Sequence, residues 1–161
     1  MKVGYLDELN RVVKILLKNH ALKLAIKNLK LKIRETSEPF IWSVIDINSL
    51  HQNLPSHIKS GWIFVLKKGI SSIAHYHPNS TQHTVMIEGE GKVRIRDHLK
   101  DLKTFDSFSS IEEDIWCIID KNVPHEFFPL KEMVVISFHT CLPDELIEIK
   151  CESGEKRIYE K

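Results

Sequence analysis

The chain has 161 residues, of which 42% are hydrophobic and 28% are charged. This length suits one domain with a real core, and the apolar content excludes a chain that is disordered throughout. No uncharged apolar run approaches the roughly 20 residues of a membrane helix, and the N-terminus has no signal-peptide core. We therefore expect a cytoplasmic protein without a membrane-spanning segment.

The net charge of +1 conceals an uneven distribution of charge. Residues 1–34 contain nine Lys and Arg against two acidic residues, a net charge of +7, whereas the remainder carries 14 basic and 20 acidic residues, a net charge of −6. Such a basic segment could bind nucleic acid or an anionic surface. Because no recognition-helix pattern accompanies it, we expect no nucleic-acid partner; the segment should be solvated or dock against its own domain or a second subunit.

The basic segment begins with a helical pattern. Apolar residues recur at steps of three and four, which predicts an amphipathic helix over roughly residues 5–27. At residues 29–34 apolar and basic residues alternate instead, as in a half-buried strand, and residues 20–28 fit either period. We interpret residues 1–34 as a helical appendage that leads into the first strand, and residues 35–161 as the main domain. Because an apolar stripe needs a cover, we expect the helix and the strand to support a homodimer.

The main domain is predicted to consist of short strands. The candidates are rich in β-branched and aromatic residues and are bounded by Gly, Pro, Asn or Asp. They are residues 40–47, 61–68, 83–88, 92–96, 114–119 and 133–139. Because no helix intervenes, they favour an antiparallel sandwich or barrel. The acidic tail over residues 144–161 gives only a weak helix or strand signal.

Histidines follow a pattern that is typical of a metal site. His75 and His77 are two residues apart, so on an extended strand both imidazoles point to one face and can converge on one ion. After a turn at residues 78–79, Gln82 opens the next strand and can lean towards the same point. His125 follows a later turn and can bring a third imidazole across the fold.

The spacing of these residues resembles that of the cupin superfamily. The first cupin motif is matched in every interval, with Gln in place of Glu, by Gly69, His75, His77, Gln82 and Gly89. The second motif is matched in spacing and in the histidine, but not in its Gly, Pro and Asn letters, by Asp114, residues 120–122, His125 and Pro129. Asn122 stands at a Gly position, which is reasonable because Asn tolerates a left-handed turn.

The resemblance covers residues 69–129 and implies a single-domain (monocupin) protein of the mainly β class. Its expected fold is one antiparallel cupin-type jelly-roll β-barrel with an N-terminal α-helix outside it. The resemblance also implies one divalent transition metal ion held by His75, His77, His125 and Gln82. Imidazoles with oxygen donors suit Fe, Mn, Ni, Cu or Zn, and the sequence does not choose among them.

The Gln in place of Glu changes the expected chemistry of the centre. Because the carboxamide of Gln82 is neutral, the charge of the cation stays uncompensated, which favours an anionic small-molecule ligand. Gln82 can bind the ion directly or hold a metal-bound water by a hydrogen bond. The alternative is a degenerate barrel that kept its histidines without a metal.

Further residues are candidates for the interior. If Gln82 points inward, Thr84 and Met86 on the same strand do so too, and Phe127 shares the face of His125. These three are our candidate substrate-binding residues, with core packing as the alternative.

Two other groups of polar residues are expected near the barrel wall. Strand alternation should turn His83 away from the metal site, and His139 could either reach the cavity or lie at the surface. In residues 92–96 the basic side chains should be solvated, because a buried unpaired Arg is costly.

The leading functional hypothesis is a metal-dependent enzyme, dioxygenase-like, that acts on a small molecule. No side chain stands out as a general base, which suits chemistry carried by a metal. Two alternatives stay open, because the cupin fold hosts many chemistries. They are a non-catalytic ligand-binding or regulatory module, and a sugar isomerase or epimerase in which a histidine shuttles a proton.

Overall fold

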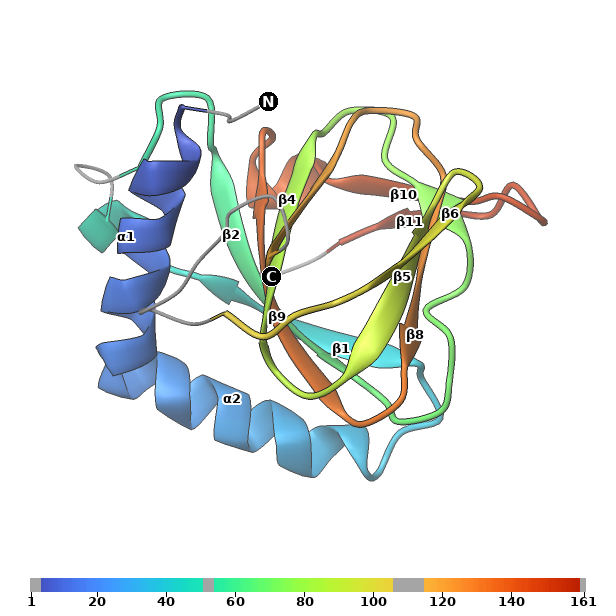
Figure 1. Cartoon of the computed structure of the whole chain (residues 1–161), viewed down its shortest axis with the longest axis horizontal. Coiled ribbons are helices and arrows are strands. Elements are labelled where there is room, and N and C mark those ends of the chain that lie inside the picture. Colours follow the sequence, from blue (N-terminus) through green and yellow to red (C-terminus); the bar gives the residue numbers. More distant parts are fainter. Residues whose placement is uncertain (1–3, 51–53, 106–114, 160–161) are drawn as a thin grey trace.

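In the computed structural model, which describes residues 4–50, 54–105 and 115–159, two helices precede a barrel of two sheets (Figure 1). Helix α1 spans Leu6–Lys18 and helix α2 spans His20–Ile33. Asn19 separates them, because its extended backbone (ψ 125°) interrupts the helix and its side chain then accepts the N–H of Leu22 as the N-cap of α2. None of the helices in the described part of the chain is long and apolar enough to cross a membrane.

The strand predicted over residues 29–34 is wrong, since α2 continues to Ile33. Leu29 and Ile33, four residues apart, are buried, whereas Leu31 between them is 54% exposed. A helical period therefore governs the segment. The local alternation with lysines concealed that period because it covers less than two helical turns.

The barrel consists of a five-stranded and a six-stranded sheet. The first has the order β1-β2-β9-β4-β7 and the second the order β11-β10-β3-β8-β5-β6. The strands of the first are β1 (Phe40–Ile45), β2 (Ser60–Leu66), β4 (Gln82–Glu88), β7 (Trp116–Ile119) and β9 (Met133–His139). Those of the second are β3 (His75–Tyr76), β5 (Gly91–Ile95), β6 (His98–Asp101), β8 (His125–Pro129), β10 (Ile147–Lys150) and β11 (Lys156–Ile158). Within the described residues, two 3-10 turns, Asn48–Leu50 and Pro143–Glu145, lie in connections.

The predicted fold class is confirmed, because neighbouring strands within each sheet pair antiparallel. Every predicted strand segment contains a strand, although the structure of Asp114, which opens the predicted strand 114–119 and the second motif, lies outside the described residues. The basic residues of β5 are solvated as expected: Val93 is fully buried, whereas the Arg94 side chain is 50% exposed.

The helices cover the outer face of the five-stranded sheet. Their apolar residues form one buried cluster with that face, which we call the outer cluster (Figure 1). From the helices it contains Leu6, Leu9, Val12, Val13, Leu16, Leu22, Leu29 and Ile33, and from the sheet Ile45, Ile63, Val65, Val85, Val134, Ile136 and Phe138 among others. The apolar stripe of the helices is thus covered within the chain. This removes our reason for expecting a homodimer, which stays a prediction.

A second buried cluster fills the space between the two sheets, and we call it the inner cluster. It is richer in aromatic side chains and contains Phe40, Trp62, Leu66, Met86, Val93, Cys117, Phe127, Met133, Val135, Cys141, Leu146 and Tyr159. The candidate metal centre lies beside this cluster.

Candidate metal centre

Three histidines converge inside the barrel. His75 lies on β3 directly opposite His125 on β8, and His77 follows two residues after His75. All three are at least 94% buried. One ligand atom from each lies within 4.8 Å of those of the other two, which is close enough for a single ion to be held between them. The convergence of the three imidazoles that the sequence spacing predicts is therefore confirmed.

The backbone fixes the orientation of each ring. Nδ1 of His75 lies 2.7 Å from the carbonyl oxygen of Ile73, and Nδ1 of His77 lies 2.7 Å from that of Ile147. Nδ1 of His125 lies 2.9 Å from the carbonyl oxygen of Val123. Because a carbonyl oxygen only accepts, each Nδ1 carries the proton, and Nε2 keeps its lone pair for a metal.

The donor set fits a divalent transition metal. Among the described residues, Nε2 of His125 is the buried side-chain nitrogen or oxygen that has no hydrogen-bond partner, and such atoms are rare in folded proteins. Burial and the neighbouring His75 lower the pKa of His77 to about 4, and burial lowers the pKa of His125 well below its usual value. The imidazoles of His77 and His125 are therefore neutral at pH 7, as metal ligands must be.

Two unusual backbone conformations support these rings. Asn122 adopts φ +66°, the left-handed conformation that its place in the second motif predicts, and its N–H donates to the carbonyl oxygen of His77. Ile73, whose carbonyl orients His75, adopts φ +68°. Neither signal is visible as a glycine in the sequence.

Gln82 lies in the barrel beside His77, on the inner face of β4. Its amide nitrogen donates to Oγ1 of Thr84 at 2.7 Å, and Thr84 in turn bonds Oγ of Ser137 at 2.7 Å. A side-chain hydrogen bond with Gln82 raises the pKa of His77 slightly against the larger lowering by burial. The amide nitrogen is thus engaged away from the histidines, so that its oxygen is the atom which can turn towards them. Whether Gln82 binds a metal directly or holds a water stays a prediction.

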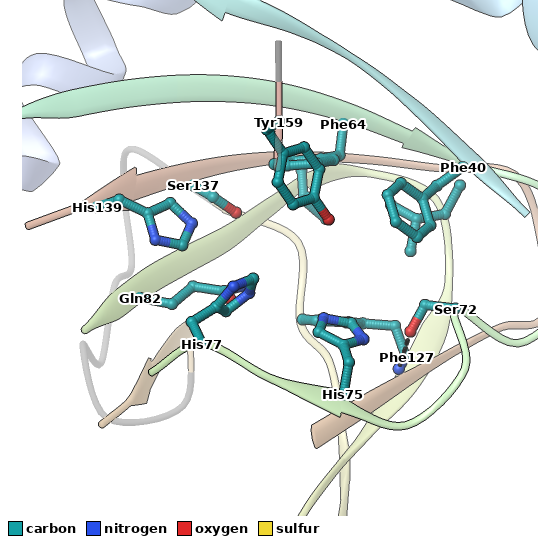
Figure 2. A pocket seen from close by; sticks show the side chains of 12 residues that line it. Phe40, Phe64, Ser72, His75, His77, Gln82, Phe127, Ser137, His139 and Tyr159 are labelled. Carbon is teal, nitrogen blue, oxygen red and sulfur yellow. Dashed lines mark hydrogen bonds between the residues drawn. The ribbon is translucent and has the colours of Figure 1, made fainter. Parts of the chain in front are cut away.

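A cavity of about 40 Å³ adjoins the histidines (Figure 2). Figure 2 shows His75 and His77 on one side and the rings of Phe40, Phe64 and Tyr159 on the other. It is lined by Phe40, Phe64, Leu66, Ser72, His75, His77, Gln82, Phe127, Val135, Ser137, His139 and Tyr159. Typical ligand pockets measure roughly 300–1,000 Å³, so this cavity admits a few atoms only.

The candidate substrate-binding residues differ in their relation to the cavity. Phe127 lines it, whereas Thr84 is buried and holds Gln82, and Met86 is part of the inner cluster. His139, for which the sequence left two positions open, is 1% exposed and lines the cavity. Its Nδ1 lies 2.7 Å from Oγ of Ser80.

The expected orientation of His83 is confirmed. It lies on the opposite face of β4, under α1, where the hydroxyl of Tyr5 is 2.7 Å from its Nε2. The carbonyl oxygen of Phe138 is 3.4 Å from its Nδ1. Both ring nitrogens are therefore engaged, and His83 is part of the packing between the helices and the sheet.

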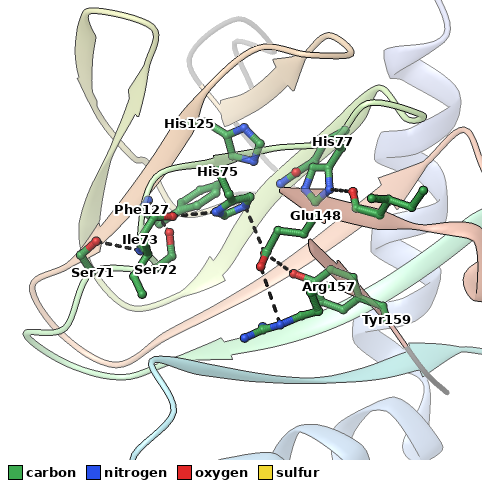
Figure 3. Close-up of polar contacts among 12 residues, drawn as sticks. Ser71, Ser72, Ile73, His75, His77, His125, Phe127, Glu148, Arg157 and Tyr159 are labelled. Carbon is green, nitrogen blue, oxygen red and sulfur yellow. Dashed lines mark hydrogen bonds and ion pairs between the residues drawn. The ribbon is translucent and has the colours of Figure 1, made fainter. Parts of the chain in front are cut away.

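One charged residue near the histidines is not indicated by the sequence pattern. Glu148 on β10 has a side chain that is 3% exposed, and its Oε1 lies 3.6 Å from Nε2 of His75. The hydroxyl of Tyr159 donates to Oε1 at 2.5 Å, and Nε of Arg157 lies 3.7 Å from Oε2 (Figure 3). The only signal in the sequence was the weak strand pattern around residues 145–149, in which the two isoleucines rather than Glu148 would be expected to face inward.

No protein-family model matches this sequence, and no curated protein matches it. Among solved structures, a mutant of salicylate 1,2-dioxygenase from Pseudoaminobacter salicylatoxidans has a TM-score of 0.55 and 11% identity, with coverage of 73% of this chain and 33% of that one. A complex of that enzyme with gentisate gives a TM-score of 0.55, 12% identity and coverage of 73% and 31%. The chain spans about a third of the length of these dioxygenase chains.

A third similar structure is an uncharacterised protein with a double-stranded β-helix domain from Klebsiella pneumoniae, with a TM-score of 0.47, 15% identity and coverage of 78% of this chain and 89% of that one. With its two antiparallel sheets and its inward-facing histidines, the chain has the fold of the cupin superfamily. The likeness concerns the fold.

Proposed function

We propose that the protein is a metal-dependent enzyme that acts on a small molecule, and that it is an oxygenase. The observation that carries this proposal is the buried histidine triad, in which the ring orientation frees the Nε2 atoms and leaves that of His125 without a partner. His75, His77 and His125 would hold the ion, and Gln82 would complete or tune the site. A bound ion of this kind polarises a substrate oxygen or binds dioxygen.

The cavity supports a small substrate. One wall is aromatic and the other carries hydrogen-bonding groups from Gln82, Ser137 and His139, so that a ligand with an apolar body and a polar or anionic end would be complementary to it. The fold neighbours are named for salicylate and one of them binds gentisate. A ring of that size exceeds a cavity of about 40 Å³. We therefore favour a smaller substrate, with Phe127 against it and Thr84 and Met86 supporting the wall.

Metal analysis and oxygen uptake test the proposal. Protein purified without added metal should contain about one transition metal ion per chain, and His77→Ala should lose it. His83→Ala is the matched control, because His83 is equally buried but lies outside the barrel interior. Iron-loaded protein should then consume oxygen with a member of a panel of small thiols and diketones. Equal metal contents in wild type and His77→Ala would refute the ligand assignment.

A non-catalytic ligand-binding module is the second candidate. In that case the metal-loaded protein would consume no oxygen with any compound of the panel, while one of them would still raise its melting temperature.

A further inference from the structure

We propose that Glu148 is the carboxylate ligand of the metal centre and supplies the negative charge that the neutral Gln82 does not. This inference rests on the proposed function, since it presumes that the histidines bind a metal. The sequence pattern gave no reason to expect it, because Glu148 lies 66 positions after Gln82 on another sheet.

The sheet places Glu148 next to the triad. Strand β10 pairs antiparallel with β3, and Ile149 is the partner of Tyr76. Glu148 is the neighbour of Ile149, and His75 and His77 are the neighbours of Tyr76. Because neighbouring residues of a strand point to opposite faces, Glu148, His75 and His77 all lie on the inward face of the sheet. Figure 3 shows its carboxylate directed towards the ring of His75.

The contact with His75 places a carboxylate oxygen next to a ligand atom of the site. Nδ1 of His75 donates to the carbonyl oxygen of Ile73, so Nε2 is the ring atom left to bind a metal. Oε1 of Glu148 lies 3.6 Å from this Nε2. Two neighbouring ligand atoms of one transition metal ion, each at about 2.0–2.1 Å from it, would be about 3.0–3.4 Å apart, which is close to the separation of Oε1 from Nε2 of His75.

The remaining contacts of Glu148 hold the carboxylate in place. Tyr159, which is itself buried, donates to Oε1, and Arg157 lies beside Oε2 with its guanidinium near the rings of Phe40 and Trp42. A buried carboxylate is costly unless hydrogen bonds and an opposite charge accompany it. These contacts meet part of that cost, as the outer partners of metal ligands do.

Glu148 also alters the expected substrate. Three neutral imidazoles and one carboxylate leave a divalent ion with one unit of positive charge, where Gln82 alone would leave two. We infer that the centre favours a monoanionic or neutral ligand over a dianion.

The test measures the affinity for Zn(II) and Co(II) by calorimetry and chelator competition. Glu148→Gln keeps the shape of the side chain and removes its charge, and the affinity should fall by about 10- to 100-fold or more. Glu155→Gln is the matched control: it lies on the same hairpin, and its side chain is 65% exposed and paired with Lys150. Its affinity should equal that of the wild type. An unchanged affinity in Glu148→Gln would overturn the inference.

A transfer of the carboxylate tests the inference from the other side. In the Glu148→Gln background, Gln82→Glu should restore most of the lost affinity, whereas in the wild type, where a carboxylate is already present, it should add less than about tenfold. Gln82→Glu in the wild type tests the inference even if Glu148→Gln fails to fold. A gain in metal affinity well above tenfold would show that the wild-type ion has no carboxylate ligand, and would contradict the inference. Wild-type protein that binds no metal would refute the proposed function, whereas metal binding that is indifferent to Glu148 would refute this inference alone.

Discussion

The outer face of the five-stranded sheet and the inner face of the barrel place the same types of residue in different chemistry. On the outer face, His83 packs against the rings of Tyr5 and His57, and both of its ring nitrogens are engaged. On the inner side, His125 keeps one buried nitrogen without a partner. Burial alone therefore does not distinguish a structural from a ligating histidine. The difference lies in whether the surrounding groups use both nitrogens or only one.

Removal of residues 1–33 is expected to have the largest effect, because it uncovers the outer face. Eight buried helix side chains belong to the outer cluster, and at about 1.5–3 kcal/mol each their burial matches or exceeds the roughly 5–15 kcal/mol by which domains are stable. The truncated protein should be insoluble or unfolded by circular dichroism. A folded, soluble truncation would show that the helices are the separable appendage that we first expected, and light scattering would then report whether they had supported a dimer.

A substitution on the inner side should leave the fold and remove the metal. His125→Ala deletes the imidazole with the unpartnered nitrogen, so the affinity for Co(II) should fall by at least about 100-fold, more than for a residue that only supports a ligand. His83→Ala should keep the wild-type affinity and lose stability instead. Equal losses of metal affinity in His125→Ala and His83→Ala would contradict the distinction between a ligating and a structural histidine.

Acid should destabilise the metal-free protein through both faces. Burial lowers the pKa of His77 and of His83 to about 4, against about 6.5 in the unfolded chain. The unfolded chain therefore binds protons first, so stability is full above about pH 7 and falls as the pH drops from about 6.5 towards 4.

Urea unfolding at about pH 7.5 and pH 5 measures this effect, which should amount to about 2 kcal/mol for each of the two histidines. Saturating metal should suppress the part that belongs to His77 as long as the ion stays bound, and leave the part that belongs to His83. An unfolding free energy that is equal at the two pH values would contradict the assignment of neutral histidines to both faces.

The smallest effect is expected from Tyr5→Phe. This substitution removes the hydroxyl that contacts Nε2 of His83 and leaves a buried nitrogen without its partner, at a cost of about 1–3 kcal/mol. Urea unfolding measures the loss, and the metal affinity should not change. A loss of metal affinity in Tyr5→Phe would mean that the two faces are coupled through β4.

The predicted strand segments include all five strands of the five-stranded sheet, because these strands carry strong local signals, but only β5 of the six-stranded sheet. The strand predicted at residues 29–34 was wrong, because three alternating apolar residues cannot outweigh a helix that continues from the N-cap at Asn19. Packing against the sheet decided the period there, and Leu29 and Ile33 supplied the buried face.

The candidate site was predicted in its histidines but not in its charge. His75, His77 and His125 follow a spacing that strand geometry explains, and the structure brings them together. Glu148 was missed because hydrophobic alternation predicts that Ile147 and Ile149 face inward, whereas Glu148 is the buried residue. Functional sites are where such local rules are broken, and the partner residues that permit the exception are far away in the sequence.

The conformation of Ile73 has a consequence for the stability of the fold. A β-branched residue rarely adopts φ +68°, and such strain is on the order of 1–3 kcal/mol. The peptide that is held in this way presents the carbonyl that orients His75, so the preorganisation of the first imidazole lies in the main chain and precedes the arrival of any ion. Asn or Gly at position 73 would adopt this conformation with less strain. Ile73→Asn or Ile73→Gly could therefore stabilise the fold while the ring of His75 keeps its orientation.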